Sequence, residues 1–162
     1  MTRFLLDTNI FIQAKNLHYG FDFCPAFWEW LDVAHCAGSV FSIEKVRDEL
    51  IGGGDDLADW ARAQPDTFFI PADAAALPSL QETTTWATGA GYEAAAVSTF
   101  LQGADYYLVA QAKALGHTLV THEIVANTVK NVKIPNACLA LGIRYMNTFQ
   151  MLRHETARFV LP

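Results

Sequence analysis

The sequence predicts an α/β fold in three layers, with helices on both faces of a central, mostly parallel β-sheet. Short apolar runs typical of buried strands alternate along the chain with longer stretches of helical periodicity. Strands that alternate with helices form parallel sheets whose two faces are covered. Apolar residues make up 52% of the 162 residues, which is enough for a substantial core, and we expect residues 1–162 to form a single domain.

The individual elements follow from apolar periodicity and from the residues that begin and end helices. Strands are expected at residues 3–6, 39–42, 67–70, 118–121 and 144–146. Helices are expected at residues 8–15, 25–35, 43–51, 55–63, 74–88, 92–102, 105–115, 135–141 and 148–154. Pro25 suits a first helical turn, Ser42 and Asp55 or Asp56 suit N-caps, and Gly116 suits a helix end.

Charge and cysteine content exclude several classes of protein. The formal net charge of −6 argues against a broad basic surface for nucleic acid, although a bound metal ion can invert the local charge. Three widely spaced cysteines without a C-x-x-C pair argue against a disulfide framework or a cysteine zinc site, and we expect buried free thiols. No apolar stretch is long enough for a bilayer span or a signal peptide, so we expect a soluble cytoplasmic protein with no membrane partner.

Two acidic residues stand directly after expected strands. Asp7 ends the apolar run of residues 3–6, and Glu123 follows residues 118–121. Ligands of parallel α/β sheets bind beyond the carboxyl ends of the strands, and a buried ionised carboxylate needs a compensating partner. For Glu123, the first turn of a following helix is the alternative position, because acids are favourable there.

Two further acids lie on expected helices. Glu49 projects to the edge of the apolar face of its helix, whereas Asp48 points toward water. The alternative role for Glu49 is an exposed ion pair with Lys45, four residues earlier. Asp105 projects onto the apolar stripe of its helix, although its position also suits an N-cap or a first-turn acid.

Four carboxylates from separate segments suit divalent metal ions, because Mg²⁺ and Mn²⁺ prefer hard oxygen ligands. Such acids repel one another when no ion is bound. The residues that we expect to meet in one pocket are Asp7, Glu49, Asp105 and Glu123.

Aromatic and basic residues give weaker indications. The apolar helix at residues 25–35, with Trp28 and Trp30, suits the core, and a homodimer contact is the alternative. Lys130 and Lys133 are candidates for phosphate contacts, with solvated surface lysines as the ordinary alternative. The sequence shows no aromatic platform on which RNA bases would stack.

Four motifs, in order, resemble the PIN-domain family of metal-dependent ribonucleases, which includes the VapC-type toxins of toxin–antitoxin pairs. The motifs are Leu5-Leu6-Asp7-Thr8-Asn9, Ser42 with Val46 and Glu49, Gly103-Ala104-Asp105, and Leu119-Val120-Thr121-His122-Glu123. The stretch from Lys133-Ile134-Pro135 to Leu141-Gly142-Ile143 resembles the end of such domains. The resemblance covers nearly the whole chain, and the run Asp55–Trp60 is similar to an uncharacterised branch of the family.

The resemblance implies a PIN-like fold and a Mg²⁺- or Mn²⁺-dependent ribonuclease that hydrolyses RNA phosphodiester bonds, with an antitoxin protein as partner. The four acids would be catalytic metal ligands, and the groups expected to orient Asp7 are Thr8, Asn9 and Thr121. The fourth acid is usually Asp in the family and is Glu123 here, which puts a second metal position in doubt. A catalytically inactive PIN-fold binding module and a metal-dependent phosphohydrolase of small phosphate esters are the alternatives.

Overall fold

A five-stranded parallel sheet forms the centre of the protein. The computed structural model describes all residues 1–162. The strands are β1 (Phe4–Leu6), β2 (Val40–Ile43), β3 (Phe69–Ile70), β4 (Thr118–Val120) and β5 (Tyr145–Met146), arranged in the order β3-β2-β1-β4-β5. Every neighbouring pair is parallel, with Phe4 opposite Val40 on one side and Thr118 on the other. The predicted α/β fold with a parallel sheet is therefore confirmed.

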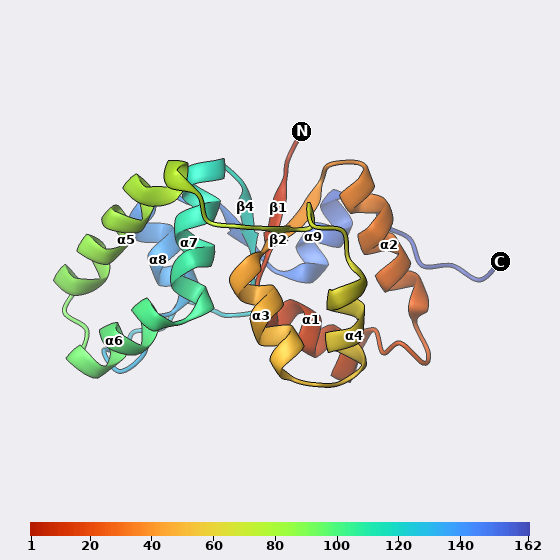
Figure 1. Ribbon diagram of the computed structural model, residues 1–162, viewed down its shortest axis with the longest axis horizontal. Helices are drawn as coiled ribbons and strands as arrows, with labels where there is room; N and C mark the ends of the chain where they lie inside the picture. Colours follow the sequence, from red (N-terminus) through yellow and green to blue (C-terminus); the bar gives the residue numbers. More distant parts are fainter.

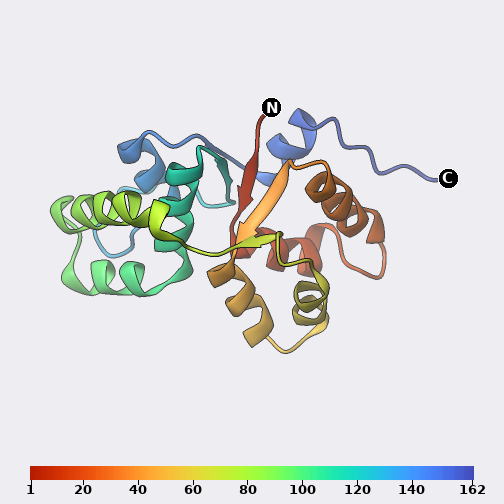
Figure 2. The same ribbon diagram turned by 45° about the horizontal axis from the view of Figure 1, so that its top comes forward.

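Helices cover both sides of this sheet. They are α1 (Thr8–Gln13), η1 (Ala14–His18), α2 (Pro25–Cys36), α3 (Glu44–Gly52), α4 (Asp56–Ala63), η2 (Ala74–Ala76), α5 (Leu77–Gly89), α6 (Ala94–Gln102), α7 (Ala104–Leu115), α8 (Ile134–Leu141) and α9 (Thr148–His154). Helices α5, α6, α7 and α8 gather on one side, and α1, α2, α4 and α9 on the other (Figure 1). The C-terminal segment runs away from the body of the molecule (Figure 2).

The core explains why β1 is central. Its three residues are fully buried, because β2 and β4 flank them and helices cover both faces. Phe11 on α1 is also fully buried and contacts the rings of Trp60 and Phe68. The aromatic helix α2 packs Phe27 and Trp28 into this core, as the core interpretation predicts.

Local differences from the predicted elements have identifiable causes. Ser42 is not an N-cap: it lies inside β2, and its buried hydroxyl donates a 2.6 Å hydrogen bond to the Leu6 carbonyl. The predicted cap at Asp55 is confirmed, since its carboxylate accepts from the Ala58 N–H at 3.1 Å. Gly116 ends α7 with a positive φ of 70°, a conformation that favours glycine.

The cysteines are free, as predicted, but only Cys138 is buried. Cys36 is exposed at the end of α2, so the expectation of buried thiols was wrong for this residue. None of the helices combines the length and the apolar content that crossing a membrane requires.

Candidate functional site

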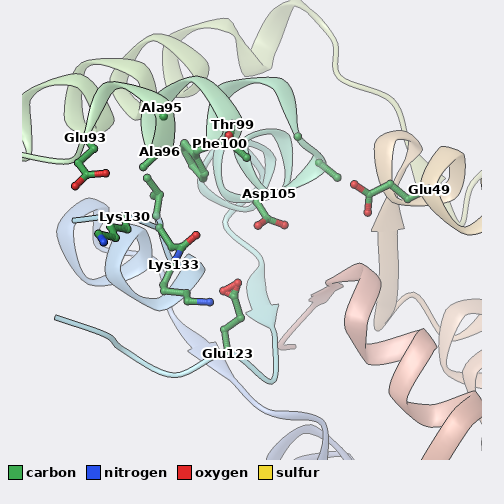
Figure 3. Close-up of a pocket in the computed structure, with 14 residues that line it drawn as sticks. Glu49, Glu93, Ala95, Ala96, Thr99, Phe100, Asp105, Glu123, Lys130 and Lys133 are labelled. Atoms are coloured by element: carbon green, nitrogen blue, oxygen red, sulfur yellow. The ribbon is translucent and has the colours of Figure 1, made fainter. Parts of the chain in front are cut away.

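Acidic side chains from different segments converge beside the carboxyl ends of the central strands. A cavity of about 370 Å³ is lined by Glu49 from α3, Asp105 from α7 and Glu123 from the segment after β4. Figure 3 shows the Asp105 and Glu123 carboxylates pointing toward one another, with Glu49 on the opposite wall. Asp7 does not line the cavity, and its side chain is only 2% exposed.

Asp7 is fixed by the sheet. Its backbone N–H donates to the Val120 carbonyl at 3.0 Å, and its carboxylate accepts a 3.0 Å hydrogen bond from the Thr121 hydroxyl. Burial, followed by the negative charges of Asp105 and Glu123, raises the pKa of Asp7 to about 8, while the hydrogen bond from Thr121 opposes the rise. The charge of Asp7 is thus coupled to two acids that line the cavity.

Asp105 occupies the first turn of α7 without capping it. Gly103 holds the N-cap position, and no side-chain capping bond is present there. Burial, followed by the negative charges of Glu123 and Glu49, raises the pKa of Asp105 to about 6, while the Lys133 ammonium opposes the rise. Asp105 is therefore a first-turn acid, as one alternative predicted, and not an N-cap, and its carboxyl group points toward Glu123 (Figure 3).

Glu49 is an exposed residue of α3 whose side chain bonds to the first residue of α1. Its carboxylate accepts a 2.6 Å hydrogen bond from the Thr8 hydroxyl. It forms no ion pair with Lys45, whose ammonium lies instead 5.1 Å from the ring centre of Tyr107. Of the groups expected to orient Asp7, Thr121 bonds to it, Thr8 bonds to Glu49 through its hydroxyl, and the exposed Asn9 makes no side-chain hydrogen bond to the acids.

Glu123 lies in an irregular segment rather than at a helix start. The next helix, α8, begins only at Ile134, so the first-turn alternative for Glu123 is wrong. Its backbone N–H donates to the Thr121 hydroxyl at 3.1 Å, and its carboxylate accepts a 3.4 Å hydrogen bond from the Ile134 N–H. The Thr121 hydroxyl thereby connects Asp7 and Glu123.

The acids fit a divalent ion by their chemistry but are not assembled around one. Carboxylate oxygens are suitable ligands, and the raised pKa values of Asp7 and Asp105 reflect burial and mutual repulsion that a cation would relieve. However, no group of three His, Cys, Asp or Glu side chains is arranged to hold a metal ion in this structure. Glu49 and Glu123 are bonded to Thr8 and to the Ile134 N–H, so ligation requires these two carboxylates to turn.

The cavity also contains residues that the acidic motifs did not indicate. Lys130 and Lys133 lie on its wall, together with Glu93, Thr99 and Asn131. The sequence identified the two lysines only as candidates for phosphate contact. No sequence signal distinguishes Glu93, Thr99 or Asn131, because their position depends on how α6 packs near the segment before α8.

Comparisons with known proteins support the fold. The model of a family described as a domain of unknown function, DUF4411, matches residues 4–159. Among curated proteins, none matches this chain.

Three solved structures share the architecture. The crystal structure of VapBC2 from Rickettsia felis, bound to a DNA fragment from its promoter, is 17% identical with a TM-score of 0.55, over 90% of this chain and 98% of that chain. FitAcB from Neisseria gonorrhoeae is 17% identical with a TM-score of 0.53, over 90% and 98% of the two chains. FitAB bound to an IR36 DNA fragment is 18% identical with a TM-score of 0.55, over 89% and 94%. At this identity the likeness concerns the fold, and it confirms the predicted PIN-like architecture.

Proposed function

This chain belongs to the DUF4411 family, described as a domain of unknown function, and we propose that it is a metal-dependent endoribonuclease. The observation that carries the proposal is the convergence of four acids from distant segments beside the carboxyl ends of parallel strands. Two of these acids, Asp7 and Asp105, have pKa values raised by burial and by the neighbouring carboxylates. Strongly perturbed acids beside a cavity at this edge of a sheet are typical of a functional site.

The residues that would hold Mg²⁺ or Mn²⁺ are Asp7, Glu49, Asp105 and Glu123. When bound, the ion would supply Lewis-acid chemistry for phosphodiester hydrolysis. The chain contributes the positions of the ligands: Thr121 holds the Asp7 carboxylate, and Thr8 holds the Glu49 carboxylate. Because Asp7 is buried, little water reaches its carboxylate, and little water would compete with a metal ion for its oxygens.

We further propose that the protein is the toxin of a toxin–antitoxin pair. Solved structures that share its fold include VapBC2, FitAcB and FitAB. By analogy, the partner is an antitoxin protein, and the RNA substrate is single-stranded or looped. A homodimer through the face of α2, where Val33 is 67% exposed, stays a prediction.

The test is cleavage of a single-stranded RNA by the purified full chain with Mg²⁺, with Mn²⁺ and with EDTA. We expect cleavage with the ions and none with EDTA. Asp7→Asn and Glu49→Gln should lower the rate roughly 100-fold or more, since a ligand to a catalytic ion is lost. Asp48→Asn is the matched control, because Asp48 is an exposed acid next to Glu49 on α3. Cleavage that survives both EDTA and Asp7→Asn rules the proposal out.

One observation favours a second candidate, a catalytically inactive module with the same fold. No three His, Cys, Asp or Glu side chains are arranged to hold a metal ion, and Glu123 stands where the PIN-domain family, which the four motifs resemble, usually has Asp. Isothermal calorimetry with Mn²⁺ separates the candidates. Binding below millimolar concentration, lost in Asp7→Asn, supports the enzyme, whereas no binding in that range supports the inactive module.

A further inference from the structure

Two lysines line the cavity that contains the acids. Lys130 and Lys133 line it together with Glu49, Asp105 and Glu123, and Figure 3 shows the Lys133 side chain directed toward Glu123. Neither lysine takes part in any of the ion pairs of the structure. Lys133 is half-buried, so its ammonium is confined near the cavity rather than free in solvent.

The segment that carries these lysines is held in place although it has no regular secondary structure. The Asn136 side chain accepts from the Ala126 N–H at 3.1 Å and donates to the Ala126 carbonyl at 2.9 Å. The Val129 carbonyl accepts from the Glu93 N–H at 2.9 Å, and Val132 is buried. The lysines therefore have defined positions, as a binding group requires.

A cluster of three rings includes His122, the residue before Glu123. His18 ends η1, His122 precedes Glu123, and Phe149 is on α9. The ring centres are 5.2 Å apart for His18 and Phe149, 6.0 Å for His18 and His122, and 5.8 Å for His122 and Phe149. His18 is exposed and the other two are half-buried, so the cluster is open to solvent. Three segments far apart in the sequence form it, which is why the sequence showed no stacking platform.

Glu123 connects the two features. It lines the acidic cavity, and it also lines a smaller hollow of about 180 Å³ together with His122, Asn147 and Gln150. Glu123 thus lines the cavity that contains the lysines and acids, and it also lines the hollow that contains His122, one ring of the cluster.

We propose that a single RNA strand crosses the acidic site between the lysine pair and the ring cluster, with its phosphates on Lys130 and Lys133 and a base against His18, His122 or Phe149. This inference rests on the proposed function and assigns residues to the binding of its RNA substrate. Lysines bind backbone phosphates without reading sequence, and unpaired bases stack on aromatic side chains. Bases in a duplex are stacked on one another, so the ring cluster selects unpaired RNA.

Binding and cleavage must be measured separately. The probe is a fluorescein-labelled single-stranded RNA of about twelve nucleotides, and its binding to the full chain is followed by fluorescence anisotropy in EDTA at several salt concentrations. The same sequence as a duplex should bind more weakly. Lys133→Gln should lower the slope of log affinity against log salt by about 0.7, because one phosphate contact is lost. Lys133→Arg should restore the slope.

The ring variants should behave differently. Phe149→Ala should weaken binding roughly tenfold without changing the salt slope, since stacking is not ionic, and Phe149→Trp should retain binding. His18→Ala tests the same platform at an exposed position, where folding is not at risk. Arg62→Gln and Phe23→Ala are the matched controls: Arg62 pairs with Asp59 on the surface of α4, and the Phe23 side chain is 66% exposed and is not one of the three clustered rings.

The outcomes separate this inference from the ribonuclease proposal. An unchanged salt slope in Lys133→Gln means that the lysine only offsets the charge of the acids, and it overturns the path. Unchanged affinity in both His18→Ala and Phe149→Ala means that the rings serve packing or contact another protein, and it overturns the path as well. Cleavage with Mn²⁺ despite those results leaves the ribonuclease proposal standing. The expected binding without cleavage supports the proposed RNA path and contradicts the proposed ribonuclease activity.

Discussion

Replacing the buried acid Asp7 by Asn should stabilise the protein relative to the natural one, and this gain should grow as the pH rises. The pKa of Asp7 is raised from 3.8 to about 8, first by burial and then by the charges of Asp105 and Glu123. Asn keeps the size of the side chain and the carbonyl oxygen that can accept from Thr121, but it carries no charge.

The sign follows from proton binding. Between pH 3.8 and about 8 the unfolded chain has an ionised Asp7 while the folded protein keeps the proton. The folded state therefore binds more protons, and the free energy of unfolding of the natural protein falls as the pH rises through this range. At about 1.36 kcal/mol per pH unit, the interval from 3.8 to about 8 corresponds to a loss of about 6 kcal/mol at most. The loss is complete above pH 8 and absent below pH 3.8.

Urea unfolding followed by circular dichroism in EDTA measures the effect. We expect the difference in unfolding free energy between Asp7→Asn and the natural protein to grow from about pH 5 to about pH 8 by a few kcal/mol, in favour of the variant. Asp48→Asn, an exposed acid on α3, should show no such growth. If the difference in unfolding free energy between the variant and the natural protein is the same at about pH 5 and about pH 8, the argument that Asp7 is a destabilising buried charge is refuted. A variant less stable than the natural protein near pH 8 refutes it as well.

Three further predictions concern the site and the core. Mn²⁺ affinity, measured by calorimetry, should rise from about pH 6 to about pH 8 because Asp7 and Asp105 must release protons to bind an ion; a pH-independent affinity would contradict their role as ligands. Thr121→Val removes the hydrogen bond to the Asp7 carboxylate, so the pH profile of RNA cleavage should move to higher pH and the rate should fall roughly tenfold to 100-fold; an unmoved profile would show that Thr121 does not act through Asp7. Phe11→Ala should lower the free energy of unfolding in urea by about 3–5 kcal/mol, because the ring is fully buried against Trp60; a loss below about 1 kcal/mol would mean that the core refills the space.

The strands and the positions of the acids could be predicted because they depend on local patterns. The apolar run before Asp7 and the run of residues 118–121 predicted two strands, and both lie near the sheet centre as β1 and β4. Parallel strands place their carboxyl ends at one edge. Asp7 and Glu123 were therefore expected near each other, and the charge of Glu123 does raise the pKa of Asp7.

Other features could not be predicted because they depend on tertiary contacts. Ser42 suits an N-cap by residue type, but its hydroxyl bonds to the Leu6 carbonyl on the neighbouring strand. The hydroxyl of Thr8 was expected to orient Asp7 and instead holds Glu49, a residue 41 positions away. Residues 122–133 have no helical or strand pattern, and the Asn136 side chain in α8 holds Ala126 within this segment.

The hydrogen bond from the Thr121 hydroxyl constrains when the site can form during synthesis and folding. Asp7 and Thr121 are 114 residues apart in the chain, yet their hydrogen bond exists only when β4 has paired with β1 in the correct register. A slip of one residue would turn Thr121 to the opposite face of the sheet. During synthesis, most of the polypeptide must therefore leave the ribosome before Asp7 and Thr121 can bond, so a partly synthesised chain lacks the assembled acidic site.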